Sequence, residues 1–438
     1  MDSALTLLKA GGVFGGGGAG FPTWKKLAAP AETLIINGAE CEPLLKSDQF
    51  LMLQNADTLV LAADALREIV GASKAIIALK AHYEQQTRAL ETALKARDVP
   101  VSLCILPAVY PVGDEQAIVY ASTGKIVPPQ SLPGSVGCCV VSVSTALNAW
   151  AALRGIPVTK RLVTVTGLIR RPGLYDVPIG TSVRDVIGTA GGATVSAYSV
   201  LLGGPMMGEL LKDWEQAVIT KTNGGVLVLP ETHLLARRAS LSLTHMRNRA
   251  KSACIQCRFC TDLCPRYLLG HALYPHRVMR AFAMDRADPS ALLCMECGIC
   301  EMYACPMGLS PRRVQASLKP WLRDDGTQPD RELYPRQGAM RDGRQVPSER
   351  LSARIAVSEY DMPVPEKVVA VTPGHVCIPL KQHIGVLAKA CVLPGDRVAK
   401  GQVIGEMDAD ALGANVHASI GGTVVSVEDS ICIQAEVL

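Results

Sequence analysis

Two runs of closely spaced cysteines are the strongest sign of redox chemistry in this chain. Of its 438 residues 15 are cysteines, and eight of these form the runs Cys254-x2-Cys257-x2-Cys260-x3-Cys264-Pro265 and Cys294-x2-Cys297-x2-Cys300-x4-Cys305-Pro306. Three thiolates at this spacing can occupy three corners of a cubane 4Fe–4S cluster, and a more distant cysteine must supply the fourth. Structural zinc is the alternative, but zinc sites are usually built from paired C-x2-C knuckles. The spacing therefore favours iron–sulfur clusters.

The two runs also form an internal repeat, because their first three cysteines are offset by 40 residues. The spacing resembles that of bacterial two-cluster ferredoxins, in which the fourth cysteine of each run binds the other cluster. By this resemblance one 4Fe–4S cluster takes Cys254, Cys257, Cys260 and Cys305, and the other takes Cys294, Cys297, Cys300 and Cys264. The second run departs from the pattern, since four residues instead of three precede Cys305.

The seven cysteines outside these runs are scattered: Cys41, Cys104, Cys138, Cys139, Cys377, Cys391 and Cys432. No secretory signal is evident, and the long apolar stretch 51–70 carries four charged residues, so we expect a cytoplasmic chain with no membrane span. In a reducing compartment clustered cysteines indicate metal and not disulfides. We therefore expect most of the scattered cysteines to be small buried apolar residues.

The composition is that of an ordinary globular protein, with 48% hydrophobic and 19% charged residues. A net charge of +4 and only 4% aromatic residues argue against a nucleic-acid partner. The charge is uneven, because residues 237–354 carry 18 Arg and 2 Lys against 11 acidic residues. This basic region is either a solvated face around anionic clusters or a docking surface for an acidic partner or a phosphate-bearing substrate.

A glycine-rich loop near the N-terminus is the second chemical signal. It reads Gly15-Gly16-Gly17-Gly18-Ala19-Gly20-Phe21-Pro22-Thr23, and Lys26 follows. Such a loop lets backbone amides approach a phosphate, although a flexible turn has the same composition. It matches neither the Rossmann fingerprint nor the Walker A loop.

The elements after this loop alternate between strand and helix patterns. We expect strands at 33–36, 75–79 and 102–106 and helices at 54–70 and 82–97. This order predicts an α/β sheet with polar segments at the strand ends, where such sheets bind ligands.

Three segments together resemble the flavin- and NADH-binding subunit of respiratory complex I and the C subunit of Rnf electron-transport complexes. They are the G-A-G-F-P-T loop with its lysine, the N-x-x-E-x-E-P segment at 37–43 and the G-D-E turn at 113–115. The resemblance implies an FMN site contacted by Gly15, Gly17, Gly18, Lys26, Asn37 and Glu40 and lined by Gly113 and Asp114. It places Phe21, Glu42 and Glu115 near the nicotinamide nucleotide. Two positions depart from the family, which often has an acid where Ala39 stands and an Asn-Asn-Val-x-Thr segment where residues 141–145 stand.

The rest of the chain predicts further small domains. A β-hairpin turning at 171–173 and a helix at 181–190 resemble the β-grasp domain of the same families. Residues 375–425 read as short strands with Gly turns and resemble lipoyl carriers and the Rnf barrel-sandwich segment, which is N-terminal in Rnf. The hairpin 406–410 lacks a carrier lysine, which excludes covalent lipoate or biotin.

The expected fold is therefore multidomain α/β. We expect a Rossmann-like FMN/NADH-binding domain (1–155), a β-grasp, SLBB-like domain (160–230), a helical ferredoxin-type domain for two 4Fe–4S clusters (235–320), a linker (321–365) and a C-terminal barrel-sandwich hybrid (366–438).

This domain order over the whole chain resembles the cobalamin reductases of propanediol-utilisation microcompartments. The resemblance implies electron transfer from NADH through FMN and two clusters to cob(III)alamin and cob(II)alamin. It also implies an adenosyltransferase and shell proteins as partners, although residues 1–10 show no targeting helix. Such transfer needs no acid–base pair, so no catalytic residue is predicted. The alternatives are an Rnf-like subunit docked to a membrane or protein acceptor, and a conduit with clusters but no working nucleotide site.

Overall fold

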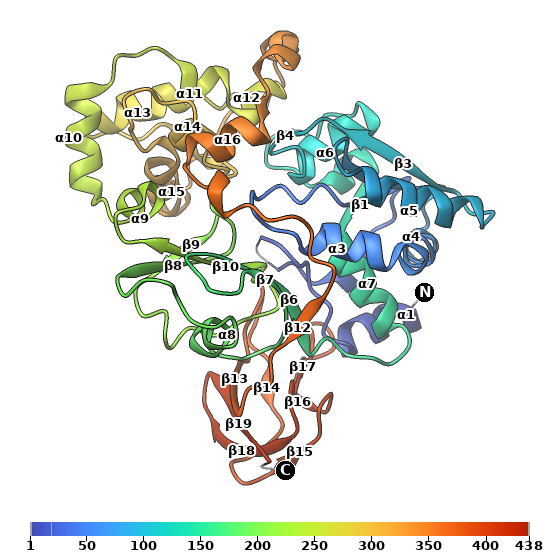
Figure 1. The fold of residues 1–438 in the computed structure, drawn as a ribbon. Coiled ribbons are helices and arrows are strands. Elements are labelled where there is room, and N and C mark those ends of the chain that lie inside the picture. The colour runs from blue at the N-terminus through green and yellow to red at the C-terminus, as the bar shows by residue number, and fades with distance from the viewer. Residues whose placement is uncertain (1, 19, 437–438) are drawn as a thin grey trace.

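The N-terminal part of the chain folds around a parallel four-stranded sheet. The computed structural model describes residues 2–18 and 20–436 (Figure 1). The strand order is β3-β2-β1-β5, from the strands β1 (Thr33–Asn37), β2 (Lys74–Lys80), β3 (Val101–Leu106) and β5 (Cys138–Ser142). The chain leaves β1 for β2 on one side, and β5 returns on the other. Asn37 and Ser142 therefore end neighbouring strands at the switch point, where open α/β sheets bind ligands.

Helices cover both faces of this sheet. They are α1 (Asp2–Ala10), α2 (Thr23–Leu27), α3 (Ser47–Gln54), α4 (Ala56–Val70), α5 (Glu84–Lys95), α6 (Glu115–Thr123) and α7 (Val143–Ala152). The buried stripe of α4 includes Leu59, Ala63, Leu66 and Val70, the spacing of an amphipathic helix that packs on a sheet. One expectation needs correction, because the helix expected at 54–70 begins only after Asn55. Helix α1 lies in the segment where no targeting helix was evident, and its presence alone assigns it no role in targeting.

The second sheet has six strands in the order β12-β7-β6-β10-β8-β9. The strands are β6 (Lys160–Gly167), β7 (Gly173–Pro178), β8 (Tyr198–Leu202), β9 (Glu209–Leu211), β10 (Gly225–Pro230) and β12 (Val368–Ala370). The predicted hairpin is present as the antiparallel pair β6 and β7. The predicted helix is α8 (Val183–Thr189), which begins after Ser182, because the Ser182 side chain accepts a hydrogen bond from the amide of Asp185.

The region of the cysteine runs consists of short helices and loops. Its helices are α9 (Leu234–Ala239), α10 (Leu243–Ala253), α11 (Phe259–Asp262), α12 (Pro265–Leu268), α13 (Pro275–Ala283), α14 (Ile299–Met302) and α15 (Pro311–Asp324). A small core that includes Met246, Val278 and Val314 holds α10, α13 and α15 together. This core fixes the loops that carry the cysteines.

The segment expected as a linker, 321–365, is largely structured. Helix α15 continues to Asp324, β11 (Val346–Pro347) pairs with β4 (Val109–Tyr110) of the N-terminal domain, and α16 (Ser348–Arg354) follows. Leu351, Ile355 and Val357 are fully buried in a core shared with Tyr110. The expectation was wrong because these few apolar residues stand in a mainly polar sequence and are buried by contacts with distant segments.

The C-terminal strands form two small sheets that pack against the N-terminal domain. One sheet has the order β13-β19-β18-β15 and the other β14-β16-β17. Their bounds are β13 (His375–Pro379), β14 (Lys389–Ala390), β15 (Arg397–Val398), β16 (Val403–Glu406), β17 (Val416–His417), β18 (Gly422–Val427) and β19 (Ser430–Ala435). Leu8 and Val13 share one apolar core with Val376 and Ile431. The two ends of the chain are thus parts of one packed unit.

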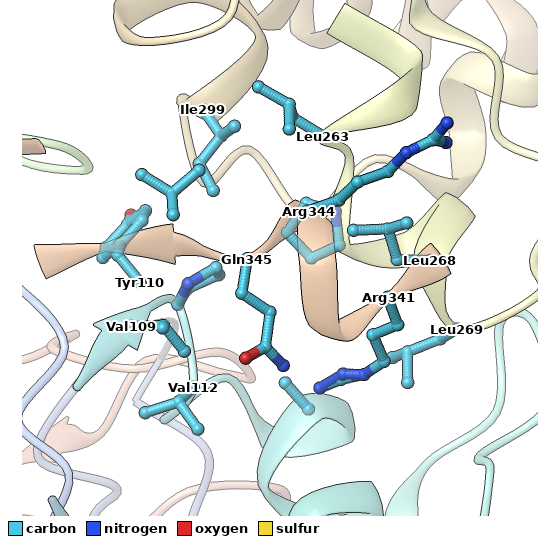
Figure 2. Close-up of a pocket in the computed structure, with 14 residues that line it drawn as sticks. Val109, Tyr110, Val112, Leu263, Leu268, Leu269, Ile299, Arg341, Arg344 and Gln345 are labelled. Carbon is cyan, nitrogen blue, oxygen red and sulfur yellow. The ribbon is translucent and has the colours of Figure 1, made fainter. Parts of the chain in front are cut away.

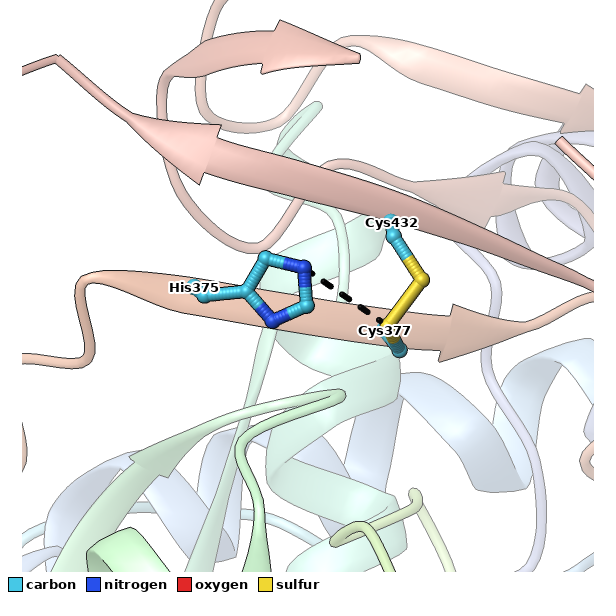
Figure 3. The surroundings of a disulfide bond; sticks show 3 residues. All are labelled: His375, Cys377 and Cys432. Carbon is cyan, nitrogen blue, oxygen red and sulfur yellow. Dashed lines mark hydrogen bonds between the residues drawn. A yellow bond between two sulfur atoms is a disulfide. The ribbon is translucent and has the colours of Figure 1, made fainter. Parts of the chain in front are cut away.

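Most of the seven scattered cysteines are not the fully buried apolar residues that we expected, and Cys41 and Cys104 are only partly buried. Cys377 on β13 and Cys432 on β19 form a disulfide (Figure 3). Cys391 is exposed, whereas Cys138 and Cys139 are buried as expected. Among residues 2–18 and 20–436, no helix is long and apolar enough to cross a membrane.

Candidate functional site

The two cysteine loops repeat each other in backbone conformation as well as in sequence. The second and fourth residues after the first cysteine have positive φ in both loops: Gln256 (56°), Arg258 (67°), Glu296 (62°) and Gly298 (81°). Left-handed residues turn successive amides toward one side, which forms a concave surface for an anion. The amide of Glu296 donates to Cys294 Sγ at 3.3 Å. Such loops suit sulfur atoms that carry negative charge.

The fold brings the first three cysteines of the first run near Cys305, the last cysteine of the second run. Burial raises the pKa of Cys260 to about 12, and the nearby thiols of Cys305, Cys257 and Cys254, followed by Cys264, raise it further. We call Cys254, Cys257, Cys260 and Cys305 the outer set. The amide of Leu309 donates to Cys305 Sγ at 3.3 Å, so the extra residue before Cys305 does not remove it from the group.

The other four cysteines are grouped in the same way. Burial raises the pKa of Cys300, and Cys294, Cys297 and Cys264 contribute further. We call Cys264, Cys294, Cys297 and Cys300 the inner set. Each set gathers four thiols with no acidic ligand, a donor group that fits a 4Fe–4S cluster. The assignment of each cysteine as a ligand stays a prediction.

The inner set is joined directly to the N-terminal domain. Tyr110 Oη donates to the Cys297 carbonyl at 2.7 Å. Arg266, two residues after Cys264, makes two hydrogen bonds to the carboxylate of Asp114, the second at 3.0 Å. The side chains of Arg266 and Asp114 are only 9% and 12% exposed, so this ion pair is shielded from solvent.

A small cavity lies at the same joint (Figure 2). Val109, Tyr110 and Val112 line one side, and Leu263, Leu268 and Ile299 line the other, with Arg341, Arg344 and Gln345 between them. Its volume of about 30 Å³ is room for about one water molecule. The cavity therefore does not hold a nucleotide or a corrinoid.

The glycine-rich loop lies beside the switch point of the sheet. Gly17 and Gly18 are exposed, and nothing lies within 4 Å of where a Cβ would stand at either residue. The loop is closed by the Gly15 amide, which donates to the carbonyl of Phe21 at 2.9 Å. The open space over two glycines fits the close approach of a ligand such as FMN. Ala19 lies outside the described residues.

Residues far along the chain fix the position of this loop, and none of them was predicted as a site residue. The amide of Gly16 donates to Thr145 Oγ1 at 2.8 Å. Arg161 donates to the Gly16 carbonyl at 2.6 Å and to Ser144 Oγ at 3.2 Å. Thr145 lies in the segment that departs from the complex I pattern. Arg161 belongs to the next domain, where nothing in its local sequence distinguishes it.

The predicted polar residues at the strand ends do come together. Asn37 Nδ2 donates to the Gly113 carbonyl at 2.8 Å, and the Gly113 amide donates to Cys41 Sγ at 2.7 Å. Lys26 Nζ pairs with Glu115 Oε1 at 2.5 Å. The glycine-rich loop, the end of β1 and the turn before α6 thus surround one region.

The two predicted glutamates of the 37–43 segment are partly buried and serve structural contacts. Glu40 Oε2 accepts from the amides of Asp48 and Gln49, and burial followed by Asp48 raises the Glu40 pKa to about 8. Glu42 Oε2 accepts from the amide of Met206 at 2.8 Å, and burial raises its pKa to about 7. Glu42 Oε1 is buried with no hydrogen-bond partner among the described residues.

The C-terminal domain holds the base of the glycine-rich loop. Trp24 Nε1 donates to the Gly413 carbonyl at 2.7 Å, and Lys9 Nζ donates to the carbonyls of Asp408 and Ala409. The hairpin that would carry a lipoyl lysine is therefore turned onto the N-terminal domain.

Lys221 joins the β-grasp and C-terminal domains to residues 12–14, just before the glycine-rich loop. Its Nζ donates to the Gly12 carbonyl at 2.8 Å and lies 4.6 Å from the centre of the Phe14 ring. His383 packs on the other side of this contact, with its ring 4.2 Å from that of Phe14.

Family models match four parts of the chain. The Nuo51 FMN-binding domain matches residues 8–151, the SLBB domain 162–210, the 4Fe-4S dicluster domain 253–310 and the RnfC barrel sandwich hybrid domain 364–437. These matches confirm the predicted fold class. They define a multidomain flavin and iron–sulfur electron-transfer protein.

Relatives narrow this class to one family. The chain is 42% identical over 433 residues to cobalamin reductase PduS of Citrobacter freundii, covering 97% of this chain and 95% of that protein. It is 32% identical over 275 residues to the C subunit of the proton-translocating ferredoxin:NAD(+) oxidoreductase complex of Clostridium ljungdahlii, covering 61% of this chain and 57% of that protein. The chain belongs to the PduS cobalamin reductase family, as the sequence predicted.

A solved structure shares the fold. The NAD+-reducing NiFe-hydrogenase in its H2-reduced state aligns with a TM-score of 0.50 and 23% identity, over 75% of this chain and 63% of the hydrogenase chain. At this identity the likeness concerns the fold alone.

Proposed function

We propose that the chain is an NADH-dependent cobalamin reductase, which uses FMN and two 4Fe–4S clusters to reduce cob(III)alamin and cob(II)alamin. FMN accepts the two electrons of a hydride and gives them up singly, and each cluster carries one electron at a time. The near full-length match to cobalamin reductase PduS carries this proposal. We further propose that it supports cobalamin recycling in propanediol degradation inside a cytoplasmic microcompartment, with an adenosyltransferase and shell proteins as partners.

The chain's own residues would perform two tasks. Gly17 and Gly18 leave space for FMN, which Gly15, Lys26 on α2 and Asn37 at the end of β1 would contact. The nicotinamide site would include Phe21 and Glu115, which are partly exposed, with Glu42 near it.

The second task is to order the two cysteine sets between flavin and solvent. The inner set contacts the N-terminal domain through Tyr110 and Arg266. The outer set is partly exposed and adjoins Ile255 and Phe259, which are 62% and 52% exposed. An acceptor would approach the molecule on this side, where the surrounding sequence is basic.

The test is an anaerobic reaction of the reconstituted protein with NADH and hydroxocobalamin, followed by visible spectroscopy. We expect the spectrum of Co(II) corrinoid to appear only when FMN and NADH are both present. An unchanged corrinoid spectrum in the complete reaction would overturn the proposal.

A second candidate function is an Rnf-like electron-transfer protein with a protein acceptor. It is favoured by the match to the C subunit of the Clostridium ljungdahlii complex and by the RnfC-type C-terminal domain. In the same experiment this function predicts bleaching of flavin and clusters by NADH while the corrinoid stays unchanged.

A further inference from the structure

Three side chains that commonly bind metals meet on the outer face of the C-terminal sheet (Figure 3). His375 and Cys377 are two residues apart on β13 and so lie on one face, and Cys432 is the direct partner of Cys377 on β19. One possible ligand atom from each residue lies within 4.8 Å of the other two. His375 Nε2 is 3.8 Å from Cys377 Sγ. None of the three belongs to the flavin region or to either cysteine set.

The backbone on both sides of these residues is fixed. Val376 and Ile378 alternate with the two β13 ligands and are fully buried, as are Ile431 and Ile433 around Cys432. The Cys377 amide also donates to the Gly180 carbonyl of the β-grasp domain at 2.9 Å. Side chains on such strands are held in place without a bound ion, which favours a preformed site.

The donor set selects the kind of ion. Two thiolates and one imidazole suit zinc, which prefers tetrahedral sulfur and nitrogen ligands. With Zn–S near 2.3 Å and Zn–N near 2.0 Å, neighbouring ligand atoms in a tetrahedron are roughly 3.5–3.8 Å apart. His375 Nε2 lies 3.8 Å from Cys377 Sγ, close to this range, whereas the two sulfur atoms are 2.02 Å apart in the disulfide and would have to separate to it on reduction. His375 is exposed and both cysteines are partly exposed, so an ion and a fourth ligand from water can reach them.

We propose that the reduced chain binds one zinc ion through His375, Cys377 and Cys432, and that the disulfide is the oxidised, metal-free form of this site. Reduction of the disulfide takes two electrons and two protons and gives two thiols. Binding of zinc then releases those two protons as the thiolates coordinate the ion. A phosphine is a suitable reductant, because it takes the oxygen of one water molecule to become a phosphine oxide while the two thiols form.

The test uses the intact holoprotein, purified without oxygen and divided into two samples. One sample is treated with a water-soluble phosphine and the other is left oxidised; both then receive zinc, are desalted and are analysed for zinc and iron. We expect about one zinc per chain in the reduced sample and less than about a tenth of that in the oxidised one. X-ray absorption at the zinc edge should show two sulfur ligands at about 2.3 Å together with nitrogen or oxygen.

Variants separate this site from the other cysteines. C377S and C432S should lose the zinc, and H375A should bind it at least about tenfold more weakly. C391S is the matched control, because Cys391 is an exposed cysteine of the same domain, and it should keep the zinc. Iron content should be unchanged throughout, which shows that zinc has not entered the cysteine runs. H375A keeps both cysteines, so it tests the site even if the cysteine variants fold poorly.

Three outcomes would each overturn the proposal. They are equal zinc in reduced wild type, C377S and C432S, equal zinc in the reduced and oxidised wild-type samples, and an X-ray absorption spectrum without sulfur ligands.

Discussion

At the scale of single residues, Cys305 decides whether the outer set can hold a complete cluster. Its spacing departs from the ferredoxin pattern, yet the structure places it with Cys254, Cys257 and Cys260. If it is a ligand, C305S should lose one cluster, and the reconstituted protein should fall from about eight to about four iron atoms per chain. Iron and acid-labile sulfide analysis measures this change. C104S, at a scattered cysteine on β3, is the control, and retention of about eight iron atoms in C305S would exclude Cys305 as a ligand.

Lys221 makes a second prediction at this scale, which concerns pH. Burial lowers its pKa from 10.5 to about 7, so between these values the unfolded chain binds more protons than the folded chain. Stability from this residue therefore rises with pH above about 7, by at most about 1.4 kcal/mol per pH unit. K221M should remove this dependence. In thermal unfolding, the stability of wild type relative to K221M should be greater at pH 9 than at pH 7. The control K400M, at an exposed lysine of the C-terminal domain, should show the same pH dependence as wild type. A constant difference between wild type and K221M would contradict the prediction.

The sequence predicted some of these residues and not others for a physical reason. The geometry of a cluster fixes the short spacing between the cysteines that bind it, so their pattern can be recognised within one short stretch of sequence. Arg161 and Thr145 contact the glycine-rich loop, and Lys221 contacts Gly12 just before it, from segments more than 100 residues away. Nothing in their immediate sequence distinguishes them from surface or helix-capping residues.

At the scale of elements, the joint between α6 and α12 connects the flavin domain to the cluster domain. Asp114 caps α6 and pairs with Arg266 of α12 in a nearly buried contact. R266M should leave the Asp114 carboxylate buried without its partner, which typically costs about 3 kcal/mol or more, and should lower the thermal midpoint by about 5–10 °C. R247M is the matched control, since Arg247 pairs with Asp285 on the exposed surface and such pairs contribute about 1 kcal/mol or less. Differential scanning fluorimetry compares the two variants; equal midpoints would show that the joint is not stabilised by this pair.

The same scale shows where sequence patterns fail. The α/β alternation of the first domain was predictable because its strands are continuous apolar runs and its helices have a clear buried stripe. The segment 346–357 carries too few apolar residues to give a periodic signal, although Leu351 and Ile355 are fully buried. Its structure depends on β4 and on the cluster domain, which are far away in the sequence.

At the scale of the whole molecule, the C-terminal domain should influence flavin binding without contacting the flavin itself. Trp24 Nε1 donates to the Gly413 carbonyl and connects this domain to the segment after the glycine-rich loop. W24F removes that hydrogen bond, worth about 0.5–1.5 kcal/mol, and should raise the Kd for FMN by about two- to tenfold. Fluorescence titration of the flavin-free protein measures the Kd. W150F is the control, at a tryptophan of the N-terminal domain that stacks on Arg154, and it should bind FMN as wild type does. An equal loss of FMN affinity in W150F would show that the effect of W24F is not specific to the contact with Gly413.

The contact between the two ends of the chain also bears on how such proteins can be rearranged in evolution. The amide of Asn415 donates to the carbonyl of Lys9, so the last domain packs on the first helix, far from it in the sequence. A domain held in this way keeps its place whether it is translated first or last. Circular permutation of the gene is then nearly neutral for the folded structure, because the exchanged connection lies at the surface while the interface persists. The same set of domains can thus occur in different linear orders around one conserved arrangement in space.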